Sequence, residues 1–240
     1  MPLNNFSGKT VFISGATRGI GQAIAIALKL RGAKVIGSGT SIDQSLEYLD
    51  EYIQADFSDI NQIYSCADRL RFIKPDILIN NAGINVISPF CEIIPQDFLR
   101  MHQVNVFAPF SLCQAVLPGM REAGWGRIVN ISSIWGKISK EFRASYSATK
   151  FALDGMTLAL AAECSSENIL ANCIAPGFTD TELTRGILGA NLIKKLEADI
   201  PLKRIANVGE IAGFVVWLAS PENTYITGQN IAVDGGFTRA

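Results

Sequence analysis

The stretch Thr10-Val-Phe-Ile-Ser-Gly-Ala-Thr-Arg-Gly-Ile-Gly21 joins a short apolar run to a loop with three glycines. The run predicts a buried strand, and the apolar residues at helical spacing that follow predict a helix. Such a loop is typical of dinucleotide binding, because Gly15 allows a tight turn, Gly19 lets the backbone approach a pyrophosphate and Gly21 permits close packing of helix on strand. The spacing here is G-x-x-x-G-x-G rather than the common G-x-G-x-x-G.

The same alternation of strand and helix continues along the chain. Short apolar runs bounded by turn residues predict strands at Thr10–Ser14, Lys34–Gly37, Tyr52–Gln54, Ile77–Asn80, Arg127–Ile131, Leu170–Ala175 and Ile231–Val233. Helical periodicity predicts helices at Ile20–Leu30, Ile60–Phe72, Pro95–Met120, Ser145–Ser165, Thr181–Asp199 and Val208–Ala219. We therefore expect one α/β domain over residues 1–240, a Rossmann-type doubly wound parallel sheet of about seven strands with helices on both faces.

Composition excludes several classes of protein. A net charge of −1, with 48% hydrophobic and 18% charged residues, leaves no electrostatic footprint for a nucleic acid or an anionic membrane. No stretch reaches the roughly 18 apolar residues of a membrane span, so we expect a cytoplasmic protein. The single histidine, His102, reads as an ordinary helix residue, and no cysteine pair has metal-ligand spacing, so we expect no metal site. Buried free thiols are predicted at Cys66, Cys91, Cys113, Cys164 and Cys173.

Two further segments fit a nucleotide at the carboxyl edge of the sheet. Asn80-Asn-Ala-Gly83 follows the fourth predicted strand with small residues, and Asp56 follows the third strand, where it suits an adenine amine. The second strand runs into Val35-Ile-Gly-Ser-Gly-Thr-Ser41 without the acidic residue that would repel a ribose phosphate. Thr40 and Arg18 are compatible with that phosphate, so we expect NADP(H) rather than NAD(H) as the cofactor.

A candidate proton-transfer group stands at the start of the fifth predicted helix. Tyr146 and Lys150 are spaced i, i+4 and share one helical face, so an ammonium charge would favour the phenolate of a side chain that otherwise titrates near ~10. Ser133 follows the fifth strand and would hold a substrate oxygen, with Ser132 as the competing choice. Asn105 lies in the long helix that precedes this strand. Asparagine in the middle of a helix is mildly unfavourable for helix stability, which suggests a function such as holding a water behind Lys150.

The segment Phe151-Ala-Leu-Asp-Gly-Met-Thr-Leu-Ala-Leu-Ala-Ala162 is apolar on nearly every side. An outer-layer helix normally presents a polar face to water. Tight packing beneath a neighbouring helix is one explanation. We favour the other, a subunit interface, and expect a homotetramer or homodimer.

With these residues in view, the chain resembles the short-chain dehydrogenase/reductase family over essentially its whole length. The resemblance rests on Ser14–Gly21, Asn80–Gly83, Asn105, Ser133, Tyr146, Lys150, Pro176-Gly177 with Thr181, and Val233-Asp-Gly-Gly236. It implies that Tyr146 transfers a proton, that Lys150 lowers the pKa of that tyrosine and binds ribose, that Ser133 orients the carbonyl, and that Asn105 supports a proton-relay water. Ser133 is preferred over Ser132 by its distance of thirteen residues from Tyr146.

Motifs and resemblance together predict the cofactor contacts. They are Gly15, Ala16, Thr17, Arg18, Gly19, Ile20, Gly21, Thr40, Asp56, Phe57, Asn81, Ala82, Gly83, Tyr146, Lys150, Pro176, Gly177, Thr179 and Thr181. The segment from Pro176 to Thr181 is expected on the nicotinamide side.

Within the family, the chain is most similar to the 3-oxoacyl-[acyl-carrier-protein] reductases. Those enzymes use basic residues to dock an acidic carrier, and the matching positions here are Gly124 and Glu167, which disfavour acyl carrier protein as a partner. Trp135, Phe142 and Leu183 are candidate substrate contacts. Residues 178–199 have apolar residues at helical spacing and are predicted to form a substrate lid.

Three functions compete at this point. The first, which the resemblance favours, is reduction of a 3-oxoacyl thioester on a carrier protein or coenzyme A. The second is oxidation of a sugar, polyol or other secondary alcohol in a dedicated biosynthetic pathway. The third is a dinucleotide-sensing protein without turnover, which has no use for Ser133, Tyr146 and Lys150 together.

Overall fold

The computed structural model describes residues 5–41 and 46–239, without the side chains of residues 183 and 187–192. Within those ranges, seven parallel strands form one sheet in the order β3-β2-β1-β4-β5-β6-β7. The strands are β1 Thr10–Ile13, β2 Lys34–Gly39, β3 Glu51–Gln54, β4 Ile77–Asn80, β5 Gly126–Ile131, β6 Ile169–Pro176 and β7 Asn230–Val233. Each predicted strand is confirmed, and the strand order reverses between β1 and β4, which is the switch point of a doubly wound fold.

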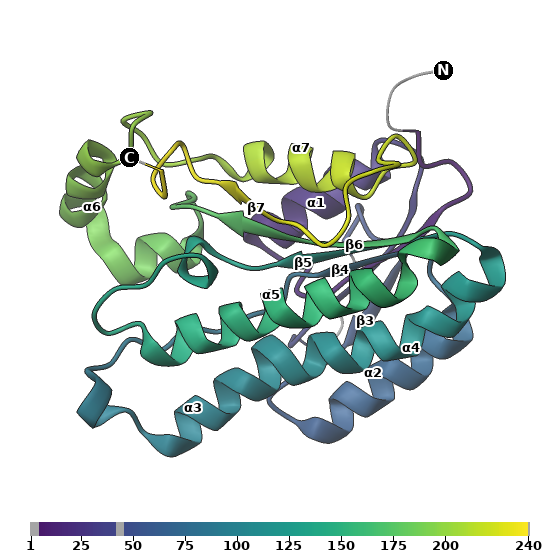
Figure 1. Cartoon of the computed structure of the whole chain (residues 1–240), viewed down its shortest axis with the longest axis horizontal. Helices are drawn as coiled ribbons and strands as arrows, with labels where there is room; N and C mark the ends of the chain where they lie inside the picture. The colour runs from purple at the N-terminus through teal and green to yellow at the C-terminus, as the bar shows by residue number, and fades with distance from the viewer. Residues whose placement is uncertain (1–4, 42–45, 240) are drawn as a thin grey trace.

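Helices cover both faces of the sheet (Figure 1). The helices are α1 Gly19–Lys29, α2 Ile60–Ile73, α3 Pro95–His102, α4 Ala108–Ala123, α5 Ala144–Cys164, α6 Glu182–Asp199 and α7 Val208–Leu218. α1 and α7 pack on one face, whereas α2, α4 and α5 pack on the other. Short turns of 3-10 helix occur at Phe90–Glu92, Ile134–Gly136 and Ser165–Glu167. The fold class predicted from the sequence is confirmed.

Side-chain alternation explains why the strands read as continuous apolar runs. In β1, Phe12 belongs to the core beneath α2 and α4, while Val11 and Ile13 belong to the core beneath α1 and α7. Successive side chains of a strand point to opposite faces, and here both faces are covered. Such strands hold the carboxyl edge of the sheet as a rigid platform for the loops that follow them.

The predicted helix Pro95–Met120 is wrong in one respect. It is divided by a turn of π-helix at Gln103–Phe107 and continues to Ala123 as α4. π-turns inside helices occur frequently at functional sites. This one contains Asn105, whose side chain bonds to groups outside the helix, as described below.

The cysteine prediction holds for four thiols and fails for one. Cys66, Cys113, Cys164 and Cys173 are buried and free, whereas Cys91 is free but exposed on the 3-10 turn Phe90–Glu92. The apolar residues around Cys91 in the sequence are themselves largely exposed, since this turn does not pack under a helix. Among the described residues, no group of His, Cys, Asp or Glu side chains is placed to hold a metal ion, and no helix has the length and hydropathy of a membrane span.

Candidate active site

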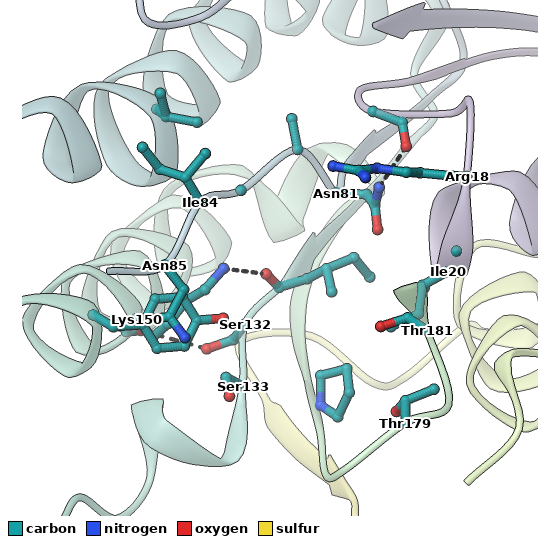
Figure 2. A pocket seen from close by; sticks show the side chains of 18 of the residues that line it. Arg18, Ile20, Asn81, Ile84, Asn85, Ser132, Ser133, Lys150, Thr179 and Thr181 are labelled. Atoms are coloured by element: carbon teal, nitrogen blue, oxygen red, sulfur yellow. Dashed lines mark hydrogen bonds between the residues drawn. The ribbon is translucent and has the colours of Figure 1, made fainter. Parts of the chain in front are cut away.

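A cavity of about 520 Å³ opens at the carboxyl ends of the strands, around the switch point between β1 and β4. Its walls come from the loops that follow β1 to β6 and from the first turns of α1, α5 and α6. Figure 2 shows these segments converging, with Arg18 and Thr181 on one side and Lys150 and Ser133 on the other. This is the edge at which open α/β sheets bind their ligands.

The glycine loop is closed against the end of β4 by Asn81. The Asn81 side chain donates to the carbonyl oxygens of Ser14 and Gly15 at 3.1 and 2.9 Å, and its backbone N–H donates to Ser14 Oγ at 3.0 Å. A Cβ added to Gly21 would lie 2.2 Å from the Gly15 oxygen, so no larger residue fits between loop and helix. Gly15 has φ +67°, a conformation that favours glycine.

The loop fits the pyrophosphate of a dinucleotide. Arg18 is the N-cap of α1 and makes no side-chain cap hydrogen bond, and the first turn of α1 contains no acidic residue. Thr17, Gly19 and Ile20 line the cavity at this point. The first N–H groups of a helix without a side-chain acceptor form a ready site for an anion, which the helix dipole also favours.

The predicted adenosine end lies beyond the glycine loop. Thr40 and Asp56 both line the cavity there. Asp56 accepts hydrogen bonds from the N–H and hydroxyl of Ser58 at 2.8 and 2.7 Å. Arg18 reaches out from the loop, mostly exposed, and lies 3.6 Å from Glu182 of α6. Arg18 and Thr40 line the same cavity, and both side chains suit a phosphate.

Ser133, Tyr146 and Lys150 line the cavity together. A hydrogen bond with Ser133 and the charge of Arg143 lower the pKa of Tyr146, but burial has the larger effect and raises that pKa to about 12. Lys150 Nζ donates to the Ile131 carbonyl oxygen at 2.8 Å (Figure 2), and burial lowers the pKa of Lys150 to about 8. Burial therefore has the largest effect on the pKa of Tyr146, and the charge that lowers it belongs to Arg143; the lowering by Lys150 stays a prediction.

The two serines after β5 make different contacts. Ser132 Oγ donates to the Lys150 carbonyl oxygen at 3.4 Å. Ser133 Oγ accepts from the Trp135 N–H at 3.3 Å and also bonds with Tyr146. The geometry therefore pairs Ser133, rather than Ser132, with the phenol.

Asn105 lies behind the cavity wall rather than in it. Its side chain accepts from the Ile84 N–H at 2.9 Å and donates to the Ile84 oxygen at 2.9 Å and to Thr149 Oγ1 at 3.1 Å. These bonds join the loop after β4 to helix α5, one residue before Lys150. Asn105 lies within the π-turn, from which its side chain reaches both the loop after β4 and helix α5.

Most predicted site residues meet in the cavity. Those that line it are Gly15, Thr17, Arg18, Gly19, Ile20, Thr40, Asp56, Phe57, Asn81, Ala82, Gly83, Ser133, Trp135, Tyr146, Lys150, Pro176, Gly177, Thr179 and Thr181. Ala16 and Gly21 instead support the loop from below. Phe142 does not line the cavity, and its side chain is half exposed to solvent. The side chain of Leu183 lies outside the described residues.

Arg143 and Asn85 are among the lining residues that the sequence analysis did not predict. Arg143 stands three residues before Tyr146, so the spacing places both residues near one side of the start of α5. The burial of Arg143 depends on Trp135, which lies outside α5. Asn85 follows the Asn80–Gly83 segment, and its Oδ1 atom is buried without a hydrogen-bond partner. Trp135, Phe178 and Phe237 pack edge to face, with ring centroids 5.3 to 6.4 Å apart, and form an apolar side to this part of the cavity.

The comparisons with known proteins agree with this architecture. A family model described as enoyl-(acyl carrier protein) reductase matches residues 15–238. The chain is 36% identical over 241 residues to the 3-oxoacyl-[acyl-carrier-protein] reductase FabG of Escherichia coli, covering 97% of this chain and 98% of that protein. It is 37% identical over 244 residues to the FabG of Pseudomonas aeruginosa, with the same coverage.

Solved structures give the same result for the fold. A candidate NAD(P)-dependent gluconate 5-dehydrogenase from Beutenbergia cavernae, with bound NADP, superposes with a TM-score of 0.94 at 32% identity, covering 99% of each chain. A gluconate 5-dehydrogenase from Burkholderia cenocepacia, in complex with NADP and tartrate, has a TM-score of 0.88 at 30% identity, covering 99% of this chain and 98% of that one. The chain belongs to the short-chain dehydrogenase/reductase family and is an NAD(P)-dependent oxidoreductase that acts on secondary alcohols and ketones.

Proposed function

We propose that this enzyme uses NADP(H) to interconvert the ketone and the secondary alcohol of a free small molecule, with Tyr146 as the proton donor and acceptor. The proposal rests on one observation: Ser133, Tyr146 and Lys150 line the same cavity as the glycine loop. The nicotinamide supplies or accepts the hydride. Tyr146 gives a proton to the substrate oxygen in reduction, and Ser133 donates a hydrogen bond that orients that oxygen.

Lys150 and Asn105 support this proton transfer in the proposal. Lys150 would hold the nicotinamide ribose from the helical turn after Tyr146. Asn105 would act as a positioning residue, because its side chain ties Ile84 to Thr149 and so fixes the loop after β4 against α5. It would also support a proton-relay water behind Lys150.

The preference for NADP(H) is supported by charge at the adenosine end. Arg18 and Thr40 line the cavity there, and the solved structures from Beutenbergia cavernae and Burkholderia cenocepacia contain NADP. We expect kcat/KM for NADPH to exceed that for NADH by more than tenfold, and Arg18→Ala to reduce this ratio. A preference for NADH of that size would overturn the cofactor assignment.

A free substrate is favoured over a carrier-bound one by the surface around Gly124 and Glu167. Gly124 is the C-cap of α4 and has no side chain, so this position offers no basic group to a carrier. Glu167 forms an ion pair with Arg121 at 3.0 Å, and Arg121 also pairs with Glu163 at 3.1 Å. The one arginine is therefore shared by two carboxylates, and this surface would repel an acidic carrier.

Reduction of a 3-oxoacyl thioester is the second candidate, supported by 36% identity to FabG over nearly the whole chain. Oxidation of NADPH with acetoacetyl-acyl carrier protein, acetoacetyl-coenzyme A and a panel of free ketones, keto-sugars and oxo acids distinguishes the two. We expect the highest kcat/KM for a free carbonyl compound. A higher value for either thioester would favour the second candidate, and NADPH binding without turnover of any carbonyl would contradict both.

Residues 178–199 are proposed as the substrate lid. Thr181, Glu182 and Thr184 line the cavity at the start of α6, and this helix lies beyond the end of the sheet in Figure 1. Amide hydrogen exchange in α6 should slow when NADP and a substrate bind together, with exchange in α2 as the internal control. Unchanged exchange in α6 would contradict a lid.

A further inference from the structure

Arg143 carries a buried charge that has no carboxylate partner among the described residues. It is 8% exposed and lines the cavity, its Nε atom has no hydrogen-bond partner, and no ion pair with it occurs among the described residues. Arg100 lines the same cavity but is more than half exposed and pairs with Asp97 at 3.0 Å. The unbalanced charge is therefore particular to Arg143 and is not shared by its basic neighbour.

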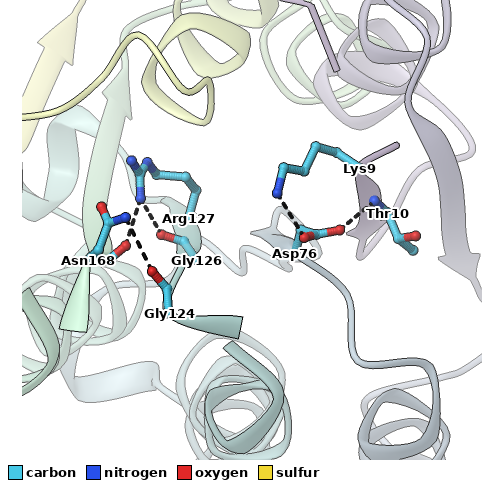
Figure 3. A network of polar contacts seen from close by, with 7 residues as sticks. All are labelled: Lys9, Thr10, Asp76, Gly124, Gly126, Arg127 and Asn168. Atoms are coloured by element: carbon cyan, nitrogen blue, oxygen red, sulfur yellow. Dashed lines mark hydrogen bonds and ion pairs between the residues drawn. The ribbon is translucent and has the colours of Figure 1, made fainter. Parts of the chain in front are cut away.

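A structural arginine of this protein looks different. Arg127, at the opposite edge of the sheet, is 2% exposed and donates to the carbonyl oxygens of Gly126 and Asn168 at 2.7 and 2.9 Å (Figure 3). It also donates to the carbonyl oxygen of Asn223 at 3.0 Å. Its guanidinium thus joins three segments of backbone. Arg143 makes no such bonds, so its burial is not explained by a role in holding the fold together.

The position of Arg143 separates it from the phosphate sites of the cofactor. It precedes α5, three residues before Tyr146, and its guanidinium carbon lies 5.7 Å from the centre of the Trp135 ring. The glycine loop that fits the pyrophosphate follows β1, whereas Ser133, Trp135 and Arg143 line the part of the cavity around Tyr146. The charge therefore faces the place where the substrate must lie.

The two acidic residues of the cavity lining do not neutralise Arg143. Asp56 bonds to Ser58, and Glu182 lies beside Arg18. Burying an unpaired charge is costly, and an arginine recovers that cost best from a carboxylate, whose two oxygens match the guanidinium fork. A carboxylate on the substrate would supply that partner.

We propose that Arg143 binds a carboxylate group of the substrate, so that the enzyme acts on an oxo acid and the corresponding hydroxy acid. This inference rests on the function proposed above and narrows its substrate class. Trp135, packed on Phe178 and Phe237, covers the pair from water and strengthens it. Asn85 Oδ1, another buried atom of the lining without a hydrogen-bond partner, is an acceptor and suits a hydroxyl of the same substrate.

Matched substrates test this assignment. The panel pairs oxo acids, including keto-sugar acids, with their uncharged methyl esters, and kcat/KM is measured for wild type, Arg143→Met and Arg143→Lys. The control is Arg71→Met, which removes an equal charge from an exposed ion pair with Asp68 on α2. We expect wild type to prefer the acid, and Arg143→Met to lower kcat/KM for the acid by about 100-fold, mainly through KM. The ester should change less than about threefold, Arg143→Lys should fall between, and Arg71→Met should match wild type.

The outcomes separate this inference from the function on which it rests. If wild type reduces esters as well as acids, or if Arg143→Met lowers both equally, Arg143 does not bind a carboxylate, although the enzyme still reduces ketones. If no carbonyl compound is reduced, the proposed function itself fails. If Arg143→Met does not fold, calorimetric titration of tartrate and its dimethyl ester into the wild-type NADP complex replaces that variant. Tighter binding of the diacid, weakened in Arg143→Lys, supports the inference. Equal binding of the diacid and the diester overturns it.

Discussion

Tyr146 is half-buried in the cavity wall beside Ser133, where its hydroxyl carries the transferable proton of the proposed reaction. Tyr146→Phe removes that hydroxyl and keeps the ring. We expect kcat to fall by about 1,000-fold, as is usual for loss of a general acid, while the dissociation constant for NADPH stays within about threefold. Stopped-flow turnover and fluorescence titration of NADPH provide the two values. Retention of activity within about tenfold would remove Tyr146 from its proposed role.

The pH dependence follows from the pKa of the same residue. Burial raises the pKa of Tyr146 to about 12, so the phenol is protonated at neutral pH and ready to act as an acid. Ketone reduction should therefore change little between about pH 6 and about pH 9, whereas alcohol oxidation needs the phenolate and should rise across this range without a plateau. Initial rates in both directions test this. A plateau of the oxidation rate near neutral pH would contradict this pKa and would show that bound cofactor lowers the pKa of Tyr146 far below about 12.

At the scale of elements, Arg127 fastens the start of β5 to the segments beside it. Its guanidinium donates to the backbone oxygens of Gly126, Asn168 and Asn223, and burial lowers its pKa to about 10. The Trp125 ring lies between two cations, 3.9 Å from Lys9 Nζ and 4.5 Å from the Arg127 guanidinium carbon. Lys9 in turn pairs with Asp76, which also accepts from the Thr10 N–H (Figure 3). These contacts connect the amino ends of β1, β4 and β5.

Arg127→Met should destabilise the protein by leaving three carbonyl oxygens without their donor. We expect the free energy of unfolding to fall by about 3 kcal/mol, because hydrogen bonds to a charged group contribute more than neutral ones. Chemical denaturation measures this change, with Arg71→Met as the exposed-arginine control. A loss below about 1 kcal/mol would mean that water replaces the guanidinium. The active site lies at the other edge of the sheet, so the KM for NADPH should remain near the wild-type value.

The π-turn is a feature of a helix that the periodicity of apolar residues does not predict. Apolar spacing predicted one helix over Pro95–Met120, and both of its halves are helical. A π-turn adds about one residue to a helix, a change too small to interrupt the apolar pattern. The turn is selected by contacts from Asn105 to Ile84 and Thr149, which are distant in sequence.

At the scale of the whole molecule, α4 and α5 present an apolar surface to solvent. Phe110, Phe151 and Leu158 are 46 to 59% exposed, and a hollow of about 410 Å³ lined by His102, Phe107 and Met156 lies beside them. Figure 1 shows these helices side by side on the outer face of the molecule. An exposed apolar surface of this kind is typical of a subunit interface.

We therefore predict a dimer or tetramer in solution that associates through this surface. Light scattering at micromolar concentration should give a multiple of the 25.9 kDa chain mass. Phe110→Asp with Phe151→Asp should shift the protein towards a smaller species, whereas Leu30→Asp, at an 80% exposed position at the end of α1, should not. A monomeric wild type would leave the all-apolar helix explained by packing beneath its neighbours.

The sequence by itself determined the strands, the helices and the identity of most cavity residues, because these depend on local periodicity and on motifs whose glycines and spacing are sterically constrained. Gly21 is an example, since its missing Cβ is required by a contact only six residues away. Tertiary structure alone decided that Arg143 is buried and unpaired, that Phe142 lies outside the cavity, and that burial raises the pKa of Tyr146. Burial and loss of hydration depend on which distant segments close over a side chain, and no local pattern records that.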